Sequence, residues 1–313
     1  MRMIIVFGSI NMDVLMRMKD FPQAGETILS PSYEMMAGGK GANQALACAR
    51  GGVKTALVGK VGDDAMGTKI LNGLRRNEVM TSGVGISDYL PTGMAFVNTN
   101  AAGENQIIVA SGANSDATAA QVPDEVLRPG SFVLLQMEVP MQENYTVMER
   151  AKKLGSKVVL NLAPAFRLPQ KALELVDVLI VNELEARMIA DVIGIGANQD
   201  LMLIAKALSS VGGLDCIVTL GSKGAVAISP NGTGWRVPAM ELKEVVDTTG
   251  AGDCFCGTLT AALHDKVALG SAMRRASVAA SLSCMKKGAQ ESYPYSADIE
   301  EVLAAGFPQA QAI

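Results

Sequence analysis

Residues 132–160 read FVLLQMEVPMQENYTVMERAKKLGSKVVL, and the fold is decided by the pattern in this stretch. Apolar runs at Phe132 to Leu135 and Val158 to Leu160 flank residues with helical spacing from Gln142 to Leu154. Apolar runs without alternation are typical of strands that are buried on both faces. A strand, a helix and a second strand in this order predict parallel strands joined by a covering helix.

The same pattern recurs along the chain. Further apolar runs lie at Met3 to Phe7, Val178 to Val181 and Cys216 to Leu220, and Glu183 to Val192 is a second helical stretch. Strands that alternate with helices predict an α/β fold with a doubly wound, mostly parallel sheet flanked by helices. No repeat, low-complexity tract or linker divides the sequence, so we expect a single domain over residues 1–313.

Two insertions, residues 14–36 and 92–110, break the alternation and predict a small β-sheet lid. Each holds turn residues, such as Gly25 and Gly103, between short apolar pieces. A small sheet cannot bury both of its faces alone, so one face should cover a ligand while another apolar surface seeks a partner.

Net charge and hydropathy limit the classes of partner that the protein can have. Lys and Arg total 27 against 31 Asp and Glu, a net charge of -4 with no long run of one sign, which argues against nucleic-acid binding. The first apolar run reaches polar Asn11 and Asp13 too soon for a signal peptide, and no stretch of about 18 apolar residues follows. We therefore expect a small-molecule partner, no membrane association and a cytoplasmic location.

The number and spacing of cysteines and histidines exclude several classes of catalytic mechanism and metal site. The 5 cysteines form no CxxC pair, and Cys254 and Cys256 lack a nearby histidine or further cysteine that would complete a metal site. His264 is the only histidine, which excludes Ser-His-Asp, Cys-His and multi-histidine zinc mechanisms. The chemistry must therefore use carboxylates, amides, backbone donors and bound ions.

Polar residues follow most of the predicted strands. In doubly wound sheets, ligands bind beyond the carboxyl ends of the strands. The residues at these positions are Asn11 and Asp13, Gln136 and Glu138, Asn182 and Glu185, and Thr219 and Gly221. Exposed loops are also polar, so this position alone assigns no role to any one of them.

The strongest local signal is Asp247-Thr-Thr-Gly-Ala-Gly-Asp253, which precedes a helical pattern with an apolar face. A glycine-rich turn that opens a helix directs backbone N–H groups and the positive end of the helix dipole at one spot, which suits a phosphate. Asp253 beside that spot is suited to accept a proton from an attacking hydroxyl. Taken alone, the motif also fits a plain helix start.

A second signal is Gly38-Gly-Lys-Gly-Ala-Asn43, which runs into a helix of small residues. Glycines let the backbone approach a ligand closely, and Asn43 offers a donor and an acceptor to a hydroxyl. The spacing is neither that of a Walker A loop nor G-x-G-x-x-G. The motif suits a sugar, although a tight helix entry would give the same pattern.

Six motifs in this order are similar to those of the ribokinase-like (PfkB) carbohydrate kinases, and they span residues 8–290. They are Gly8-Ser-Ile-Asn-Met-Asp13, Gly38-Gly-Lys-Gly-Ala-Asn43, Asn182-Glu-Leu-Glu185, Thr219-Leu-Gly-Ser-Lys-Gly224, Asp247-Thr-Thr-Gly-Ala-Gly-Asp253 and Lys287-Gly-Ala-Gln290. Within the family, Lys40 resembles the ribokinase branch. The resemblance implies an ATP-dependent sugar kinase, with phosphorylation of ribose as the first expectation.

The resemblance also implies a role for each matched residue. Asp253 would be the base, and the anion hole would be formed by Gly250, Ala251 and Gly252. Besides Asp253, the sugar hydroxyls would be held by Asn11, Asp13, Gly39, Lys40, Asn43 and Glu138. The nucleotide site would contain Asn182, Glu185, Thr219, Gly221, Ser222, Lys223, Gly224, Gly252 and Ser277, with Glu185 organising water around Mg²⁺. An activating K⁺ would be enclosed by loops that contain Asp247, Thr249, Ser283, Lys286, Gly288 and Ser292.

Several alternatives stay open on the sequence. The substrate could be another pentose or a nucleoside, such as deoxyribose, and a non-catalytic sugar-binding protein could share the fold. Retention of Asp253 and the anion-hole glycines argues against the latter, and the missing glycine fingerprint after the first strand argues against a nicotinamide-dependent oxidoreductase. Ser277 and Ala37 depart from the family pattern, which affects fine contacts only. The resemblance further implies a homodimer formed through the lid.

Overall fold

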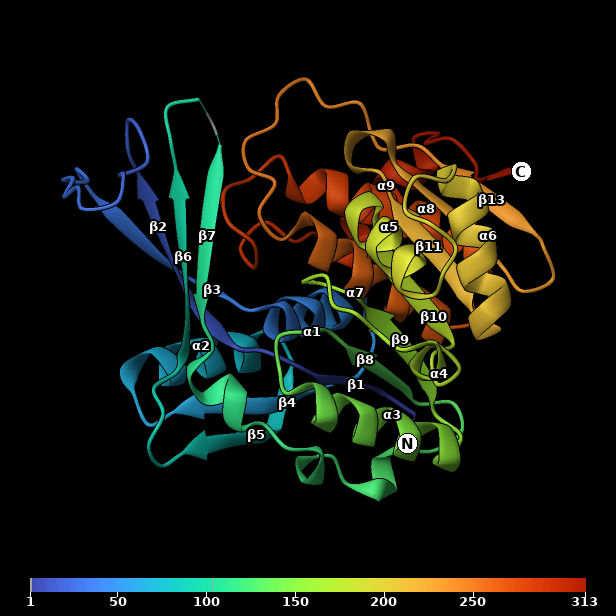
Figure 1. Ribbon diagram of the computed structural model, residues 1–313, viewed down its shortest axis with the longest axis horizontal. Coiled ribbons are helices and arrows are strands. Elements are labelled where there is room, and N and C mark those ends of the chain that lie inside the picture. The colour runs from blue at the N-terminus through green and yellow to red at the C-terminus, as the bar shows by residue number, and fades with distance from the viewer. Residues whose placement is uncertain (1, 103) are drawn as a thin grey trace.

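The apolar runs of the sequence form the centre of a 10-stranded sheet in the order β14-β13-β12-β11-β10-β9-β8-β1-β4-β5 (Figure 1). The computed structural model describes residues 2–102 and 104–313, so Gly103, a predicted turn residue, lies outside the described residues. The strands of this sheet are β1 (Ile4–Phe7), β4 (Thr55–Gly62), β5 (Met80–Ser87), β8 (Phe132–Leu135), β9 (Lys157–Asn161), β10 (Val178–Asn182), β11 (Asp215–Thr219), β12 (Ala225–Ile228), β13 (Gly234–Val237) and β14 (Gln311–Ala312).

The sheet is parallel from β5 through β11, and only the edge formed by β12, β13 and β14 is antiparallel. The reversal occurs at a short turn, η4 (Gly221–Lys223), which is too short for the crossover that a parallel neighbour requires. The predicted doubly wound, mostly parallel sheet is confirmed. The antiparallel edge adds detail that the apolar runs did not indicate.

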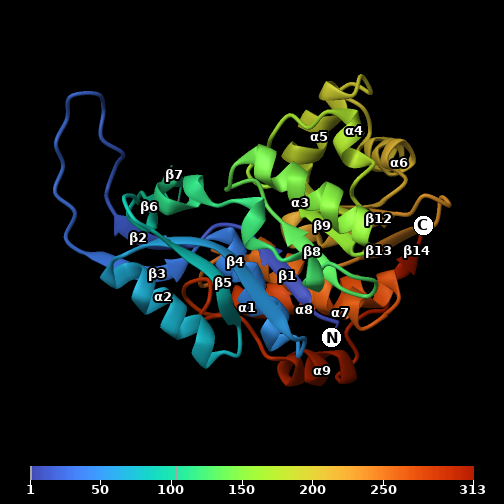
Figure 2. The same ribbon diagram turned by 90° about the horizontal axis from the view of Figure 1, so that it is seen from below.

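Helices cover both faces of the sheet (Figure 2). They are α1 (Lys40–Arg50), α2 (Ala65–Arg76), α3 (Met141–Leu154), α4 (Gln170–Leu173), α5 (Glu183–Val192), α6 (Leu201–Gly212), α7 (Ala251–His264), α8 (Leu269–Ser283) and α9 (Ser296–Ala304). Strand β1 shows why the strands are continuously apolar: Ile4 and Val6 pack into the core beside α1 and α7, whereas Ile5 and Phe7 pack into the core beside α3. Among the described residues, no helix combines the length and the apolar character needed to span a membrane.

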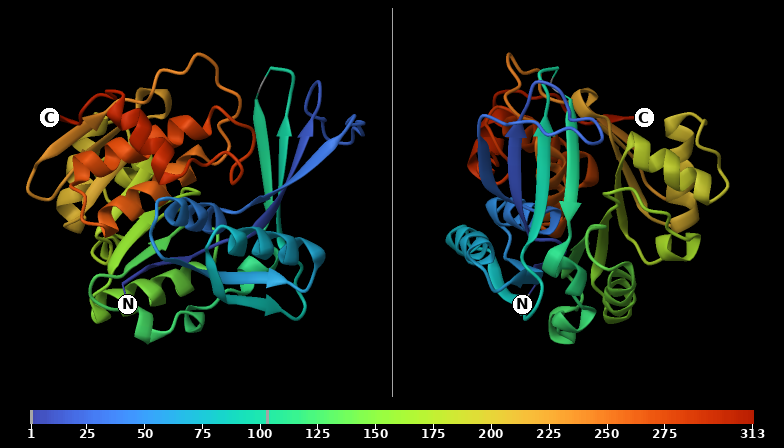
Figure 3. Two further views of the ribbon diagram at one scale, coloured as in Figure 1. Left: turned by 180° about the vertical axis from the view of Figure 1, so that it is seen from behind. Right: turned by 60° about the vertical axis from the view of Figure 1, so that its left-hand side comes forward.

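A separate 4-stranded sheet stands away from the helical layers (Figures 1 and 3). Its order is β3-β2-β6-β7, with β2 parallel to β6 and both outer pairs antiparallel. The strands are β2 (Asn11–Arg17), β3 (Tyr33–Gly38), β6 (Gly93–Thr99) and β7 (Asn105–Ala110). This small sheet starts at Asn11 and includes Gly38, so it extends beyond the predicted insertion 14–36 and carries predicted sugar-site residues on its first strand.

Short 3₁₀ helices, η1 (Gly112–Asp116), η2 (Ala119–Gln121) and η3 (Asp124–Val126), lead from the small sheet back to the large one. Asn114 in η1 accepts a hydrogen bond from the Ile10 N–H at 2.8 Å and donates to the Asn11 side chain at 2.7 Å. The buried Asn114 amide therefore ties η1 to the start of β2, at the base of the small sheet.

Candidate active site

The N-terminus of α7 depends on a glycine. Gly250 precedes α7 with φ 74°, and a Cβ there would lie 2.6 Å from both the Ala289 Cβ and the Tyr293 hydroxyl oxygen. Tyr293 in turn donates to the Gly250 carbonyl at 2.9 Å. A side chain at position 250 would therefore strain the backbone and displace its neighbours. Of the predicted anion-hole residues, the Ala251 N–H donates to the Thr248 carbonyl at 3.2 Å, and Gly252 faces open space.

Asp253 is buried in the first turn of α7, where two motifs far apart in the sequence meet. Its Oδ2 accepts from the Asn43 amide at 3.0 Å, and its Oδ1 accepts from the Gln44 amide at 2.8 Å. The Asn43 oxygen accepts from Gln290 at 3.1 Å, so this amide already bridges two protein groups. The packing of α1 against α7 thus places the predicted base beside the predicted sugar motif.

Three of the remaining predicted sugar residues, Asp13, Lys40 and Glu138, lie close enough to Asp253 and to one another for their charges to interact. Glu138 accepts from the Ser9 hydroxyl at 2.5 Å and from the Lys40 backbone N–H at 3.4 Å. Asp13 on β2 lies so close to β3 that a Cβ on Gly38 would be 2.1 Å from its Oδ2, while its Oδ1 is buried without a hydrogen-bond partner. A buried carboxylate oxygen without a partner is suited to accept a hydrogen bond from a ligand hydroxyl.

The charged groups of this cluster shift one another's pKa values. Burial and, after it, the neighbouring charges of Glu138 and Asp253 together raise the pKa of Asp13 to about 7, while Lys40 opposes the rise. Asp253 raises the pKa of Lys40 although burial lowers it. Lys40 therefore stays charged among carboxylates that repel one another.

A cavity of 760 Å³ opens beside the N-terminus of α7. It is lined by six predicted nucleotide residues, Thr219, Gly221, Ser222, Gly224, Gly252 and Ser277. The predicted residues Asn182, Glu185 and Lys223 are not among its lining residues. The cavity meets the sugar cluster at Gly252, next to Asp253.

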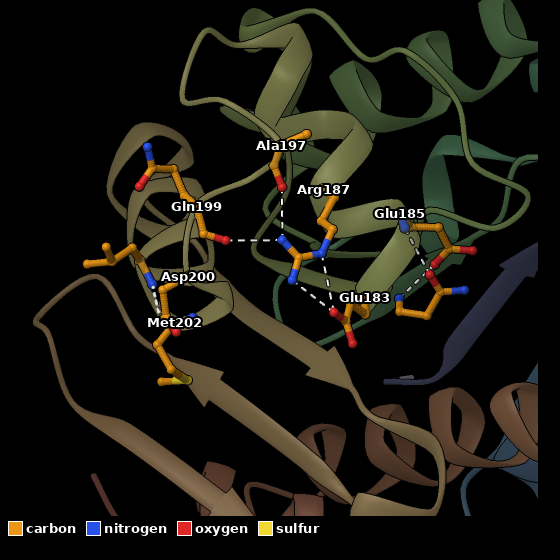
Figure 4. A network of polar contacts seen from close by, with 9 residues as sticks. Glu183, Glu185, Arg187, Ala197, Gln199, Asp200 and Met202 are labelled. Atoms are coloured by element: carbon orange, nitrogen blue, oxygen red, sulfur yellow. Dashed lines mark hydrogen bonds and ion pairs between the residues drawn. The ribbon is translucent and has the colours of Figure 1, made fainter.

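Asn182 and Glu185 are instead committed to the start of α5. Each donates through its backbone N–H to the side chain of the other at 2.8 Å, which forms a capping box. Burial raises the pKa of Glu185, against the hydrogen bond from Asn182. Figure 4 shows Arg187 one turn further on, where it pairs with Glu183 and donates to the carbonyls of Ala197 and Gln199. These contacts tie the start of α5 to the segment that precedes α6.

The loops predicted to enclose K⁺ lie together behind Gly250. Asp247 accepts from the Thr249 hydroxyl at 2.6 Å and from the Gly288 N–H at 2.9 Å. Burial alone would raise the pKa of Asp247, but these hydrogen bonds hold it below its usual value. The side chains of Ser283 and Ser292 donate to nearby backbone carbonyls, and the Lys286 N–H donates to the Ser283 carbonyl at 3.3 Å.

Comparison with known proteins identifies the family. Residues 1–295 match the pfkB family of carbohydrate kinases. The chain belongs to this family. It is 37% identical over 305 residues to the ribokinase of Bacillus subtilis, and the match covers 97% of this chain and 100% of that protein. It is 35% identical over 300 residues to the ribokinase of Haemophilus influenzae, and that match covers 95% of this chain and 97% of that protein. Arabidopsis thaliana ribokinase complexed with ribose and ATP superposes with a TM-score of 0.87 at 32% identity, covering 97% of this chain and 99% of that chain.

Some residues at the site of this kinase were not among the predicted site residues. The cavity is also lined by Met240, Val245, Phe255 and Cys284, which are apolar or weakly polar. Behind Asp253 lie buried amides that were not among the predicted site residues: Gln44, Gln136, Asn161 and Gln290. Gln136 directly follows a predicted strand and was visible as a strand-end residue. Gln290 ends the sixth motif, whereas Gln44 and Asn161 are recognisable only from their contacts.

The Asp13 pKa predicts a pH dependence of stability. Because its pKa is raised from 3.8 to about 7, the folded protein binds more protons than the unfolded chain between these values, and Asp13 lowers stability as pH rises through this window. Asp13→Asn should therefore raise the thermal midpoint of the unliganded protein by more at pH 8 than at pH 5. Asp88→Asn, at an exposed position, is the matched control. An equal shift at both pH values would contradict the prediction.

Proposed function

We propose that this carbohydrate kinase transfers the γ-phosphoryl group of ATP to the 5-hydroxyl of D-ribose. The observation that carries the proposal is the position of Asp253, which is buried at the N-terminus of α7 between the polar cluster on β2 and α1 and the 760 Å³ cavity. The names of the Bacillus and Haemophilus relatives and the ribose and ATP in the Arabidopsis complex support this substrate pair.

In the proposed mechanism, Asp253 accepts the proton of the 5-hydroxyl as that oxygen attacks the γ-phosphorus and the bond to the ADP oxygen breaks. The backbone of Gly250, Ala251 and Gly252, at the positive end of α7, stabilises charge on the moving phosphoryl group. The sugar's other hydroxyls are assigned to the polar groups of Asn11, Asp13, Gly39, Lys40, Asn43 and Glu138. The nucleotide is assigned to the cavity lined by Thr219, Gly221, Ser222, Gly224 and Ser277.

Mg²⁺ would accompany the nucleotide, since it neutralises charge on the β- and γ-phosphates. Among the described residues, no group of three or more His, Cys, Asp or Glu side chains could hold a metal ion directly. This fits an ion that is bound mainly through phosphate oxygens and water. Glu185 is the carboxylate that we assign to orienting that water, as the family resemblance implies.

A monovalent cation is the second ion that we propose. The loops that contain Asp247, Thr249, Ser283, Lys286, Gly288 and Ser292 offer oxygen donors, which suits a hard cation. Because these loops contact Gly250 through Ala289 and Tyr293, we assign to the cation a role in fixing the anion hole.

We expect K⁺ to raise turnover severalfold over Na⁺ at equal ionic strength, because the smaller ion fits a site built for the larger one poorly. The assay compares the chloride salts at constant Mg²⁺. Asp247→Asn should reduce the difference between the salts, whereas Asp265→Asn, at the far end of α7, should preserve it. Equal rates in the two salts would remove the cation from this proposal.

Substrate identity is tested by coupled ADP release with ribose, deoxyribose, fructose and adenosine. We expect the highest kcat/KM with ribose. A higher value with deoxyribose or adenosine would assign another pentose or a nucleoside instead, and no ADP release with any sugar would favour a non-catalytic binding protein. The cytoplasmic location expected from the sequence stays a prediction.

We also propose that two copies associate through the lid, formed by the small sheet. The strand register aligns Met35, Val14, Phe96 and Ile108 across all four strands on one face. Met35 is 37% exposed and Ile108 57% exposed, so this apolar row is incompletely covered within one chain. An identical row on a second copy would cover it with twofold symmetry.

Light scattering at micromolar concentration should give a mass of twice the 32.7 kDa chain. Ile108→Lys should shift the population towards single chains, because it places a charge in the apolar row. Ile86→Lys, at an exposed apolar position on β5 of the large sheet, is the matched control and should leave the mass unchanged. A single species near 32.7 kDa, with and without ribose, would refute the dimer.

A further inference from the structure

A chain of buried amides lies behind Asp253, and none of its members lines the cavity. Gln44 on α1 donates through its Nε2 to the Asp253 Oδ1 at 2.8 Å and to the Asn161 Oδ1 at 3.0 Å. Its Oε1 accepts from the Gln136 Nε2 at 2.7 Å. All three polar contacts of this amide are therefore made to protein groups.

The surroundings fix which way the Gln44 amide faces. Gln44 and Gln136 are fully buried, and Asn161 is 7% exposed. Asn161 ends β9 and donates to the Ile180 carbonyl at 3.2 Å, which leaves its oxygen for Gln44. Because Gln136 supplies a donor and Asn161 supplies an acceptor, the nitrogen of Gln44 must face Asp253.

A glutamine at this position is not explained by packing alone. Its neighbours on α1 include Ala45, Leu46 and Cys48, all buried, and the helix packs closely on α7. An apolar side chain of similar length would fill the same space without the cost of burying an amide. The amide therefore marks a requirement for a hydrogen-bond donor next to the Asp253 carboxylate.

We infer that Gln44 is a positioning residue for Asp253, an inference that rests on the proposed role of Asp253 as the base. Gln44 holds one carboxylate oxygen and Asn43 holds the other, so the carboxylate plane cannot rotate. Each oxygen of a carboxylate accepts about two hydrogen bonds, so the remaining lone pairs stay available to the sugar hydroxyl. Gln136 acts one step further back, by orienting the Gln44 amide.

The test compares Gln44→Met with the wild-type enzyme. The substitution keeps the length of the side chain and removes both of its donors, so kcat should fall about tenfold to a hundredfold because the base loses its alignment. The KM for ribose should change by less than about twofold, because Gln44 does not face the sugar. Cys48→Ala, one turn along α1 and hydrogen-bonded to the Gly257 carbonyl, is the matched control for a buried change between α1 and α7.

A double-mutant cycle separates positioning from a general structural effect. If Gln44 acts through Asp253, Gln44→Met should cause no further loss of turnover in an Asp253→Asn background. Equal factors in the two backgrounds would overturn the inference, as would an unchanged kcat in the single variant. Near-normal turnover of Asp253→Asn would instead overturn the proposed base, which distinguishes the two failures.

Should Gln44→Met fail to fold, Gln136→Met provides the same test from one step back. The Gln136→Met substitution leaves the donors of Gln44 in place but removes the partner of the Gln44 oxygen. The Gln44 amide can then turn away from Asp253. The expected loss of kcat is about threefold to tenfold, again with an unchanged KM for ribose and no further effect in the Asp253→Asn background. A loss that multiplies in that background would overturn the inference equally.

Discussion

Asp253→Asn should lower turnover by about a hundredfold or more, because the amide cannot accept the proton of the attacking hydroxyl. The substitution is nearly isosteric, and its oxygen can still accept a hydrogen bond from Gln44 or Asn43. Folding and ribose binding should therefore be largely retained. Turnover is measured by coupled ADP release, ribose binding by calorimetry and folding by thermal unfolding.

Asp265→Asn is the matched control for that experiment. Asp265 directly follows the same helix, at the end opposite the cavity, and its side chain is 58% exposed. Its replacement should change turnover by less than about twofold. Near-normal turnover of Asp253→Asn would remove Asp253 from the mechanism, whereas a lost melting transition would show that the carboxylate is needed for folding.

The strands that the sequence reveals are those with two buried faces. Strand β10 is apolar from Val178 to Val181 because its side chains alternate between two cores. Strands β4 and β5 escaped prediction for a physical reason. In β4, Gly59, Lys60 and Gly62 interrupt the apolar run, and β5 at the edge of the sheet is only partly buried. Edge strands need not be continuously apolar, so composition does not distinguish them from loops.

The same contrast applies to the site. Gly250 and Asp253 were recognisable because a glycine with positive φ and a carboxylate at a helix start form a local pattern. The contact between Gln44 and Asp253 spans 209 positions in the sequence, and no local spacing indicates it. Phe255 lies in the cavity wall, but in the sequence it cannot be distinguished from an apolar residue of the core. Local patterns identify the groups that act on the ligand, while the residues that support them depend on tertiary packing.

Lys40→Met should raise the KM for ribose by about a hundredfold or more, since it removes a charge-assisted donor and leaves the carboxylates of the cluster uncompensated. Lys40 opposes the rise in the Asp13 pKa, so that pKa should increase further in the variant. The kinetics are measured from pH 6 to pH 9. Lys60→Met is the matched control, because Lys60 pairs with Asp116 at 2.6 Å outside the site and its loss should change kcat/KM by less than about twofold. If the KM for ribose were unchanged in Lys40→Met, the Lys40 ammonium group would serve only to offset the charge of the buried carboxylates.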